Sequence, residues 1–263
     1  MVKYTLDLHD HVFDFSKKNV KSIVDKLFKK KGNIVLGISD HNWNELYSKF
    51  LKTLKTLKEY KIDLKNQRLF VSVKNKENDK IWLIKTHEVG TNQGHILLIG
   101  YNGEKTHNIK KLLKLAHKEK AIVIANHPLH PHGISYFLYL KLAGRENQSA
   151  SITKKQLKQK KFIDAVELNS YFPEDWPKVK KFSKKNKIPI VTGSDSHKPS
   201  EILRSSFQLE NLDFRSPKAF KKSFRKALKK HVKLNPVAHG FEAKYFRAVN
   251  IILHILLRKL KII

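Results

Sequence analysis

Short apolar runs rich in β-branched residues alternate along the chain with longer stretches in which lysines flank an apolar stripe at helical spacing. This alternation is typical of repeated strand–helix units around a parallel sheet or barrel. The pattern predicts strands at residues 4–8, 33–38, 69–73, 81–87, 95–100, 121–125, 163–168 and 188–192. It predicts helices at residues 17–30, 44–60, 108–118, 175–185 and 217–231. The expected fold class is therefore α/β, with a barrel as the favoured architecture.

The division of the chain follows from the same pattern. With 263 residues, the chain is long enough for one large domain with a buried core, which we place at residues 1–235. Residues 129–160 contain prolines, glycines and a polar run, which predicts an insertion or lid. Residues 236–263 form a basic and apolar extension that ends in an expected helix. Packing of this helix against the domain is favoured, with peripheral attachment to a membrane or a partner as the alternative.

Cysteine is absent, which excludes disulfides, thiolate zinc sites and a cysteine nucleophile. A bound metal would therefore use nitrogen and oxygen ligands. No segment has the roughly 18 uninterrupted apolar residues of a membrane span, and the N-terminal segment lacks an apolar stretch of signal-peptide length. These features favour a cytoplasmic protein without a transmembrane segment.

The formal net charge is +31, which favours polyanionic partners such as nucleic acid, phosphorylated metabolites or an anionic membrane surface. Nearly all of this charge is lysine, and lysine, asparagine and isoleucine are jointly plentiful, as a biased genome composition would also produce. Both explanations stay open. Lysine recognises phosphate less specifically than arginine does, so the charge favours a general electrostatic attraction of phosphate groups.

Side chains that can bind metals gather where the predicted strands end. His9 and His11 follow the first strand with a spacing that points both imidazoles the same way, because side chains alternate across a strand. Comparable residues accompany the later strands: Asp40, His41, Glu88, His95, Asn126, His127, Glu167, Asp195 and His197. In a parallel barrel these residues would all face one rim, which is where such barrels carry active sites.

Other histidines of the chain are interpreted differently. A single histidine is more often an ordinary core or surface residue than a metal ligand. We assign that role to His107, His117, His231, His239 and His254. His130 and His132 are interpreted as loop residues that would touch a substrate.

The chain resembles the PHP (polymerase and histidinol phosphatase) superfamily of metal-dependent phosphoesterases. The resemblance covers roughly residues 4–230 and rests on DLHDH, SDHN, HEVGTNQGHILLIG, ANHP, VELNS and GSDSH, which occur in the order of that family. It implies a distorted (β/α)7-type barrel with the metal site at the C-terminal ends of the strands. Amidohydrolases share the HxH motif and a late aspartate but lack the DHN and GSDSH pair.

The resemblance also implies roles for individual residues. His9, His11, Glu88 and Asp195 resemble the ligands of one metal and the catalytic residues. Glu88, His95 and His127 resemble the ligands of a second metal, with Glu88 bridging the two. His41 and His197 resemble two ligands of a third metal, while Asp40 and Glu167 resemble nearby supporting residues, with Asp40 also counted among the metal-site residues. The chain departs from the family pattern after HxH, where Asp14 is closer than the usual acid and Ser16 and Lys17 occupy the expected positions. Either Asp14 substitutes for that acid, or the third site is weak and completed by water.

Two or three divalent cations suit these residue types. Neighbouring cations activate water and offset the charge on phosphoryl oxygens, and mixed histidine and carboxylate ligands suit Mn, Zn or Fe. No nucleophile elbow and no glycine-rich phosphate loop occurs in the sequence. The favoured function is therefore hydrolysis of a phosphate ester of a small metabolite or nucleotide by metal-activated water. The alternatives are an end-directed nuclease on RNA or DNA and a binding module with a degraded, metal-poor site.

Overall fold

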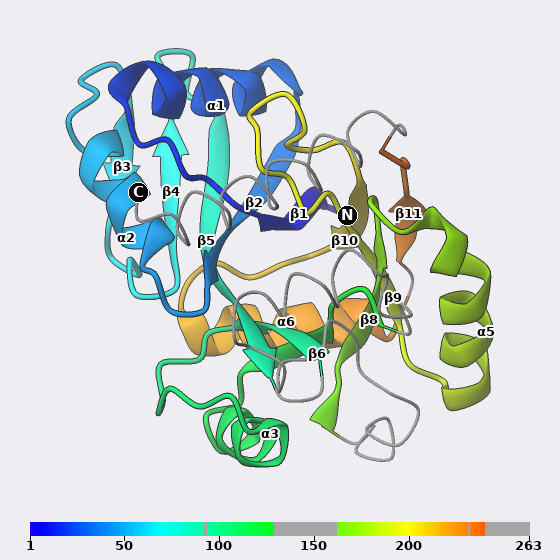
Figure 1. Ribbon diagram of the computed structural model, residues 1–263. Helices are drawn as coiled ribbons and strands as arrows, with labels where there is room; N and C mark the ends of the chain where they lie inside the picture. Colours follow the sequence, from blue (N-terminus) through cyan, green and yellow to red (C-terminus); the bar gives the residue numbers. More distant parts are fainter. Residues whose placement is uncertain (92–93, 129–161, 231, 240–263) are drawn as a thin grey trace, which may run out of the picture.

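The computed structural model describes residues 1–91, 94–128, 162–230 and 232–239 (Figure 1). Its strands are β1 (Lys3–Asp10), β2 (Asn33–His41), β3 (Lys61–Asp63), β4 (Phe70–Lys74), β5 (Lys80–Thr91), β6 (Gly94–Ile99), β7 (Ile122–Ala125), β8 (Ala165–Asn169), β9 (Ile190–Gly193), β10 (Ser206–Glu210) and β11 (Lys233–Asn235). Its helices are α1 (Lys17–Lys29), α2 (Leu46–Leu54), α3 (Ile109–Lys118), α5 (Trp176–Asn186), α6 (Pro217–Leu228) and the short 3-10 helix η2 (Pro173–Asp175).

The strands form one mixed sheet that closes almost into a barrel. Its order is β11-β10-β1-β2-β5-β6-β7-β8-β9, with β4 paired to the other part of β5 and β3 paired to β4. Beyond the end of β9, Ser196 pairs in parallel with Asp10 of β1, and the amide of His11 donates to the carbonyl of Ser196 over 2.8 Å. The chain leaving β9 therefore lies beside β1, which almost closes the sheet into a barrel.

Side chains alternate along the strands, so the sheet has an inner core on one face and an outer core on the other. Val35 of β2 and Ile84 of β5 belong to the inner cluster, which Phe220 and Phe224 of α6 complete. On the outer face, α1 and α2 pack against β2, β4 and β5, whereas α3 and α5 pack against β6 to β9. Figure 1 shows α1 and α2 beside the β2–β5 part and α5 beside β8 and β9. Helix α6 thus closes the inner core at the end opposite the histidines, where Arg225 contacts Asp164 just before β8.

Every predicted strand and helix that falls within the described residues has a counterpart, but the predicted helix over residues 44–60 is wrong in length. It stops at Leu54, and the chain continues into β3. Thr56 contributes to the stop, because its hydroxyl donates to the carbonyl of Thr53 over 2.8 Å and its amide donates to the same carbonyl over 2.9 Å. Such side-chain hydrogen bonds compete with the helical pattern. The sequence pattern also missed the short strands β3, β10 and β11.

The expectation of a parallel barrel is confirmed only as a mixed α/β barrel-like sheet. Strands β1, β2 and β5 are mutually parallel, and so are β7, β8 and β9. Between these groups β6 runs antiparallel to both β5 and β7. The reason is the short connection from β5 to β6, which leaves no room for the crossover that a parallel pair needs.

Several predictions concern residues outside those described: the insertion at 129–160, the helix at 246–263, and His130, His132, His231 and His254. The proposed division at residue 235 stays a prediction, although the backbone of Val237 exchanges two hydrogen bonds with the hydroxyl of Ser205. Within the described ranges, no helix has the length and apolar character needed to cross a membrane.

Candidate metal centre

A β-bulge in β1 places the first two histidines of the site. Asp7 pairs with Leu36 of β2, but Asp10 pairs with Ile38, so β1 carries one extra residue at this point. Such an extra residue shifts the alternation of side chains and re-aims them. Gly37 permits the bulge, because a Cβ there would lie 2.5 Å from the carbonyl oxygen of Leu8. His9 and His11 consequently face the barrel interior, above the apolar layer.

Hydrogen bonds fix which nitrogen of each ring faces the site. Nδ1 of His11 donates to the carbonyl oxygen of Ser39 over 3.1 Å, and Nδ1 of His9 donates to Oε1 of Glu167 over 2.9 Å. In neutral rings the bare nitrogens are then the Nε2 atoms, and these two atoms lie 3.3 Å apart. Two lone pairs at this distance repel each other unless a proton or a cation is nearby. This pair therefore fits a cation that accepts both nitrogens.

Glu88 of β5 lies at the centre of the histidines. Its Oε1 is 3.3 Å from Nε2 of His9 and 2.9 Å from Nδ1 of His95, and its Oε2 is 3.2 Å from Nε2 of His11. Nε2 of His127 also lies 3.3 Å from Oε1. His95 comes from the start of β6, and because β6 is antiparallel its start lies at the same rim as the end of β5. One carboxylate thus touches imidazoles from several strands.

Asp195 enters the site from the loop after β9. Its backbone is left-handed, with φ of 52°, and such a conformation in a residue other than glycine requires support from its surroundings. Asp7 provides that support: its carboxylate accepts hydrogen bonds from the amide and hydroxyl of Ser194, and from the amide of Leu203 over 3.0 Å. Oδ1 of Asp195 lies 3.6 Å from Nε2 of both His9 and His11.

Gly193 is required by the contact between Glu167 and His9. A Cβ at this position would lie 2.1 Å from Oε1 of Glu167 and 3.1 Å from Cβ of His9. Any side chain here would displace the carboxylate that orients the His9 ring. The glycine of the GSDSH motif therefore belongs to the structure of the site.

Two sets of buried donors have the composition of metal sites. His9, His11 and Asp195 form one set, and Glu88, His95 and His127 form the other; the ligand atoms of each set lie within 4.8 Å of one another. Nitrogen and carboxylate oxygen in this ratio suit Mn, Zn or Fe. The donor chemistry therefore fits divalent cations.

Electrostatics of the buried cluster agree with this fit. Burial alone would lower the pKa of His9, but the carboxylates of Glu167, Asp195 and Glu88 raise it well above its usual value. Burial alone would raise the pKa of Glu88, but the imidazoles of His95 and His9 hold it well below its usual range. Glu88 therefore stays ionised and attracts positive charge, which a proton or a cation supplies.

Of the residues expected at a third metal, two lie at the cluster and one lies at the start of a helix. Nε2 of His41 is 3.7 Å from Oε2 of Glu88, and burial lowers the pKa of His41 to about 4, so its ring is neutral at pH 7. The rings of His11 and His197 are 4.9 Å apart. Asp14, in contrast, is exposed, and its Oδ1 accepts a hydrogen bond of 2.8 Å from the amide of Ser16 at the start of α1.

Asp40 faces the outer side of the sheet. Its Oδ1 accepts a hydrogen bond from the amide of Tyr47 over 2.9 Å, and its Oδ2 is 3.2 Å from Nδ1 of His87. Because side chains alternate along β2, Asp40 and His41 point to opposite faces. The contacts of Asp40 are those of a residue that holds α2 against the sheet.

Sequence reasoning missed two contributors to the site. Asn169 donates to Oε2 of Glu167 over 3.0 Å and to Oδ2 of Asp195 over 3.3 Å. Its spacing of two residues from Glu167 on one strand was the available signal. His239, interpreted as an ordinary residue, is buried, and its ring stacks on Tyr171 at 3.9 Å between centroids while Nε2 lies 3.1 Å from the carbonyl oxygen of Ser194. No sequence signal indicated this contact.

Comparisons with known proteins add fold-level information. No family model matches the chain, and no curated protein matches its sequence significantly. The solved structure of PsfC from Pseudomonas syringae aligns over 100% of both chains with 9% identity and a TM-score of 0.61.

Two further solved structures are similar at lower scores. The lesion-specific endonuclease PfuEndoQ from Pyrococcus furiosus is 18% identical, with a TM-score of 0.49 over 89% of this chain and 57% of that one. A candidate metal-dependent phosphoesterase from Bifidobacterium adolescentis is 9% identical, with a TM-score of 0.43 over 83% of this chain and 95% of that one. The chain therefore shares its fold with PsfC.

Proposed function

We propose that the chain is a metal-dependent hydrolase of phosphate esters, acting on a small phosphorylated metabolite or nucleotide. The observation that carries this proposal is the position of Glu88, whose carboxylate contacts His9 and His11 of one donor set and His95 and His127 of the neighbouring set. A carboxylate shared by two donor sets is the arrangement that holds a pair of cations.

In this proposal His9, His11 and Asp195 hold one cation, and His95 and His127 hold another, with Glu88 between them. Divalent cations bound there would activate a water molecule and offset negative charge on the phosphoryl oxygens. Glu167 and Asn169 position His9 and Asp195 through the hydrogen bonds described above. We further propose that the barrel is of the (β/α)7 PHP type and that the cations are Mn, Zn or Fe.

The exposed histidine side chains indicate the side from which a substrate would reach the cluster. The side chains of His41 and His197 are 36% and 29% exposed, whereas those of His9, His11 and Asp195 are at most 2% exposed. Solvent therefore reaches the cluster on the His41 and His197 side. We expect the phosphate group to enter there and to contact these two imidazoles.

The test is a screen of phosphate mono- and diesters with added Mn²⁺. We expect hydrolysis that His9→Ala and Asp195→Ala each abolish, because each substitution removes a ligand atom. His117→Ala is the matched control, since His117 is exposed on α3 and lies outside both donor sets. The proposal is wrong if the folded His9 and Asp195 variants hydrolyse these esters as fast as the unaltered protein.

A nuclease acting from the end of RNA or DNA is the second candidate function. The excess of 54 Lys and Arg over 23 Asp and Glu favours it, because such a surface attracts a phosphodiester backbone. Release of mononucleotides from a labelled oligonucleotide, suppressed steeply by salt, would distinguish it from a phosphatase. A preference for monoesters in the screen would exclude it.

A further inference from the structure

A cavity lined by polar and basic residues lies on the outer side of the sheet, away from the histidine cluster. Its volume is about 630 Å³, and α2, the segment before β4 and strand β5 contribute to its lining. Lys85 lines this cavity and pairs with Ile38, a member of the outer core. The next residue, Thr86, instead donates to the carbonyl of Leu8 near the site. The sheet therefore separates this cavity from the candidate metal centre.

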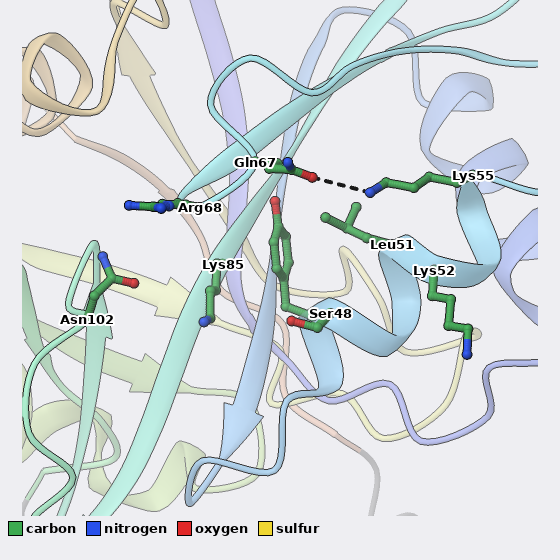
Figure 2. Close-up of a pocket in the computed structure, with 9 residues that line it drawn as sticks. Ser48, Leu51, Lys52, Lys55, Gln67, Arg68, Lys85 and Asn102 are labelled. Atoms are coloured by element: carbon green, nitrogen blue, oxygen red, sulfur yellow. Dashed lines mark hydrogen bonds between the residues drawn. The ribbon is translucent and has the colours of Figure 1, made fainter.

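Positive charge dominates the cavity. Lys52, Lys55, Arg68 and Lys85 line it, and none of its lining residues carries a carboxylate, although Nζ of Lys85 lies 4.0 Å from Oδ2 of Asp40 behind it. Figure 2 shows Lys55 facing Gln67, to which it donates over 3.2 Å, whereas the amino group of Lys52 points away from the other cations. Arg68 is notable because arginine is scarce in this chain, and its planar guanidinium suits phosphate oxygens.

A buried hydroxyl adds an observation that does not depend on charge. Tyr47 lines the cavity and is only 2% exposed, and its hydroxyl has no hydrogen-bond partner among the described residues. Burial raises the pKa of Tyr47 above its usual value, so the hydroxyl stays protonated and can donate. A buried donor without a partner costs free energy, which an acceptor from a ligand would recover.

We propose that this cavity binds the phosphate group of an anionic ligand, at a site separate from the metal centre. Arg68 and Lys85 would donate to the phosphate oxygens, and the hydroxyl of Tyr47 would donate from the floor of the cavity. A free phosphorylated small molecule and the backbone of a nucleic acid present the same phosphate chemistry. The cavity thus recognises the phosphate group, whichever molecule carries it.

The experiment is a calorimetric titration of the full chain with inorganic pyrophosphate. We expect Arg68→Gln and Lys85→Gln each to weaken binding about tenfold, since each removes a charged donor. Tyr47→Phe should weaken binding about fivefold while leaving the thermal midpoint of the free protein unchanged or higher, because it removes a donor that has no partner. Lys184→Gln is the matched control and should bind like the unaltered protein, since Lys184 is exposed on α5 and does not line the cavity.

Two further measurements make the test decisive. The His9→Ala variant should keep its pyrophosphate affinity, since the metal centre is not part of this site. Competition by a single-stranded oligonucleotide, with the same dependence on Arg68, would support the proposal and identify nucleic acid as the source of the phosphate. Loss of binding in His9→Ala, or full binding in the Arg68 and Lys85 variants, would overturn it. Arg68 is exposed, so the Arg68→Gln variant should fold, and its pyrophosphate affinity can be measured.

Discussion

Oε1 of Glu167 on β8 accepts a hydrogen bond of 2.9 Å from Nδ1 of His9 on β1, across 158 residues of sequence. This contact turns Nε2 of His9 toward the other donors of its set. Carboxylates that orient a ligating histidine in this way commonly change metal affinity by 10- to 100-fold.

Glu167→Gln should lower the affinity for Mn²⁺ by roughly 10- to 100-fold without removing a ligand. The amide keeps the shape of the side chain but loses the charge that holds the proton on Nδ1. Titration with Mn²⁺ followed by calorimetry measures the change. Glu77→Gln, at an exposed position, is the control. An unchanged affinity would show that Glu167 does not position His9.

Gly193→Ala should impair metal binding and stability together. The added Cβ would meet Oε1 of Glu167 at 2.1 Å, so the carboxylate must move away from His9. Gly32→Ala is a matched control, because a Cβ there meets nothing within 4 Å and only the φ of 97° is unfavourable. We expect both variants to lose stability, the control by about 1 to 2 kcal/mol, and only Gly193→Ala to lose Mn²⁺ affinity.

Asp14→Ala should leave the number of bound cations unchanged. The Asp14 carboxylate accepts from the amide of Ser16 and is exposed, so it belongs to the start of α1. Loss of such a helix-terminal hydrogen bond costs about 1 kcal/mol. Metal analysis and thermal unfolding of the same sample separate the two effects. A variant that lost one cation per chain would identify Asp14 as a ligand.

His239 should make stability depend on pH. Burial lowers its pKa below the usual value in the folded chain, so the unfolded chain binds more protons on this residue below about pH 6.5. The contribution of neutral His239 to the free energy of unfolding is therefore complete above about pH 6.5. It is lost as the pH falls toward the lower pKa that His239 has in the folded chain. The stability difference between the unaltered protein and His239→Gln should shrink from pH 7.5 to pH 5.5 in denaturant unfolding. A difference that is constant over this range would contradict the assignment.

Phe13 should favour substrates that carry an aromatic ring. It is 50% exposed, and its ring lies 6.0 Å from that of His11 and 5.7 Å from that of His197, at the open side of the cluster. Stacking on an aromatic side chain contributes about 1 to 3 kcal/mol per base. Phe13→Ala should therefore raise KM for a nucleotide monoester about fivefold or more. KM for glycerol phosphate should stay unchanged; an equal increase for both would show that Phe13 acts on the histidines instead.

Most strand positions could be predicted from the sequence, and so could the residues that form the two donor sets. Both depend on local alternation and on residue type. The bulge between Asp7 and Asp10 could not be predicted, because it arises from the pairing of β1 with β2. The role of His239 likewise follows from contacts with a loop 45 residues earlier in the chain. Long-range packing decides these features, so no local pattern predicts them.

The pairing of β1 with β10 has a consequence for synthesis of the chain. Tyr4 pairs with Leu209, and β2 covers only the other edge of β1. Until residues 206–210 have left the ribosome, the first strand presents an open row of backbone donors and acceptors, which is a template for intermolecular pairing. Contacts this distant in sequence also slow folding. Nascent chains that stop before β10 should accordingly need a chaperone to stay monomeric.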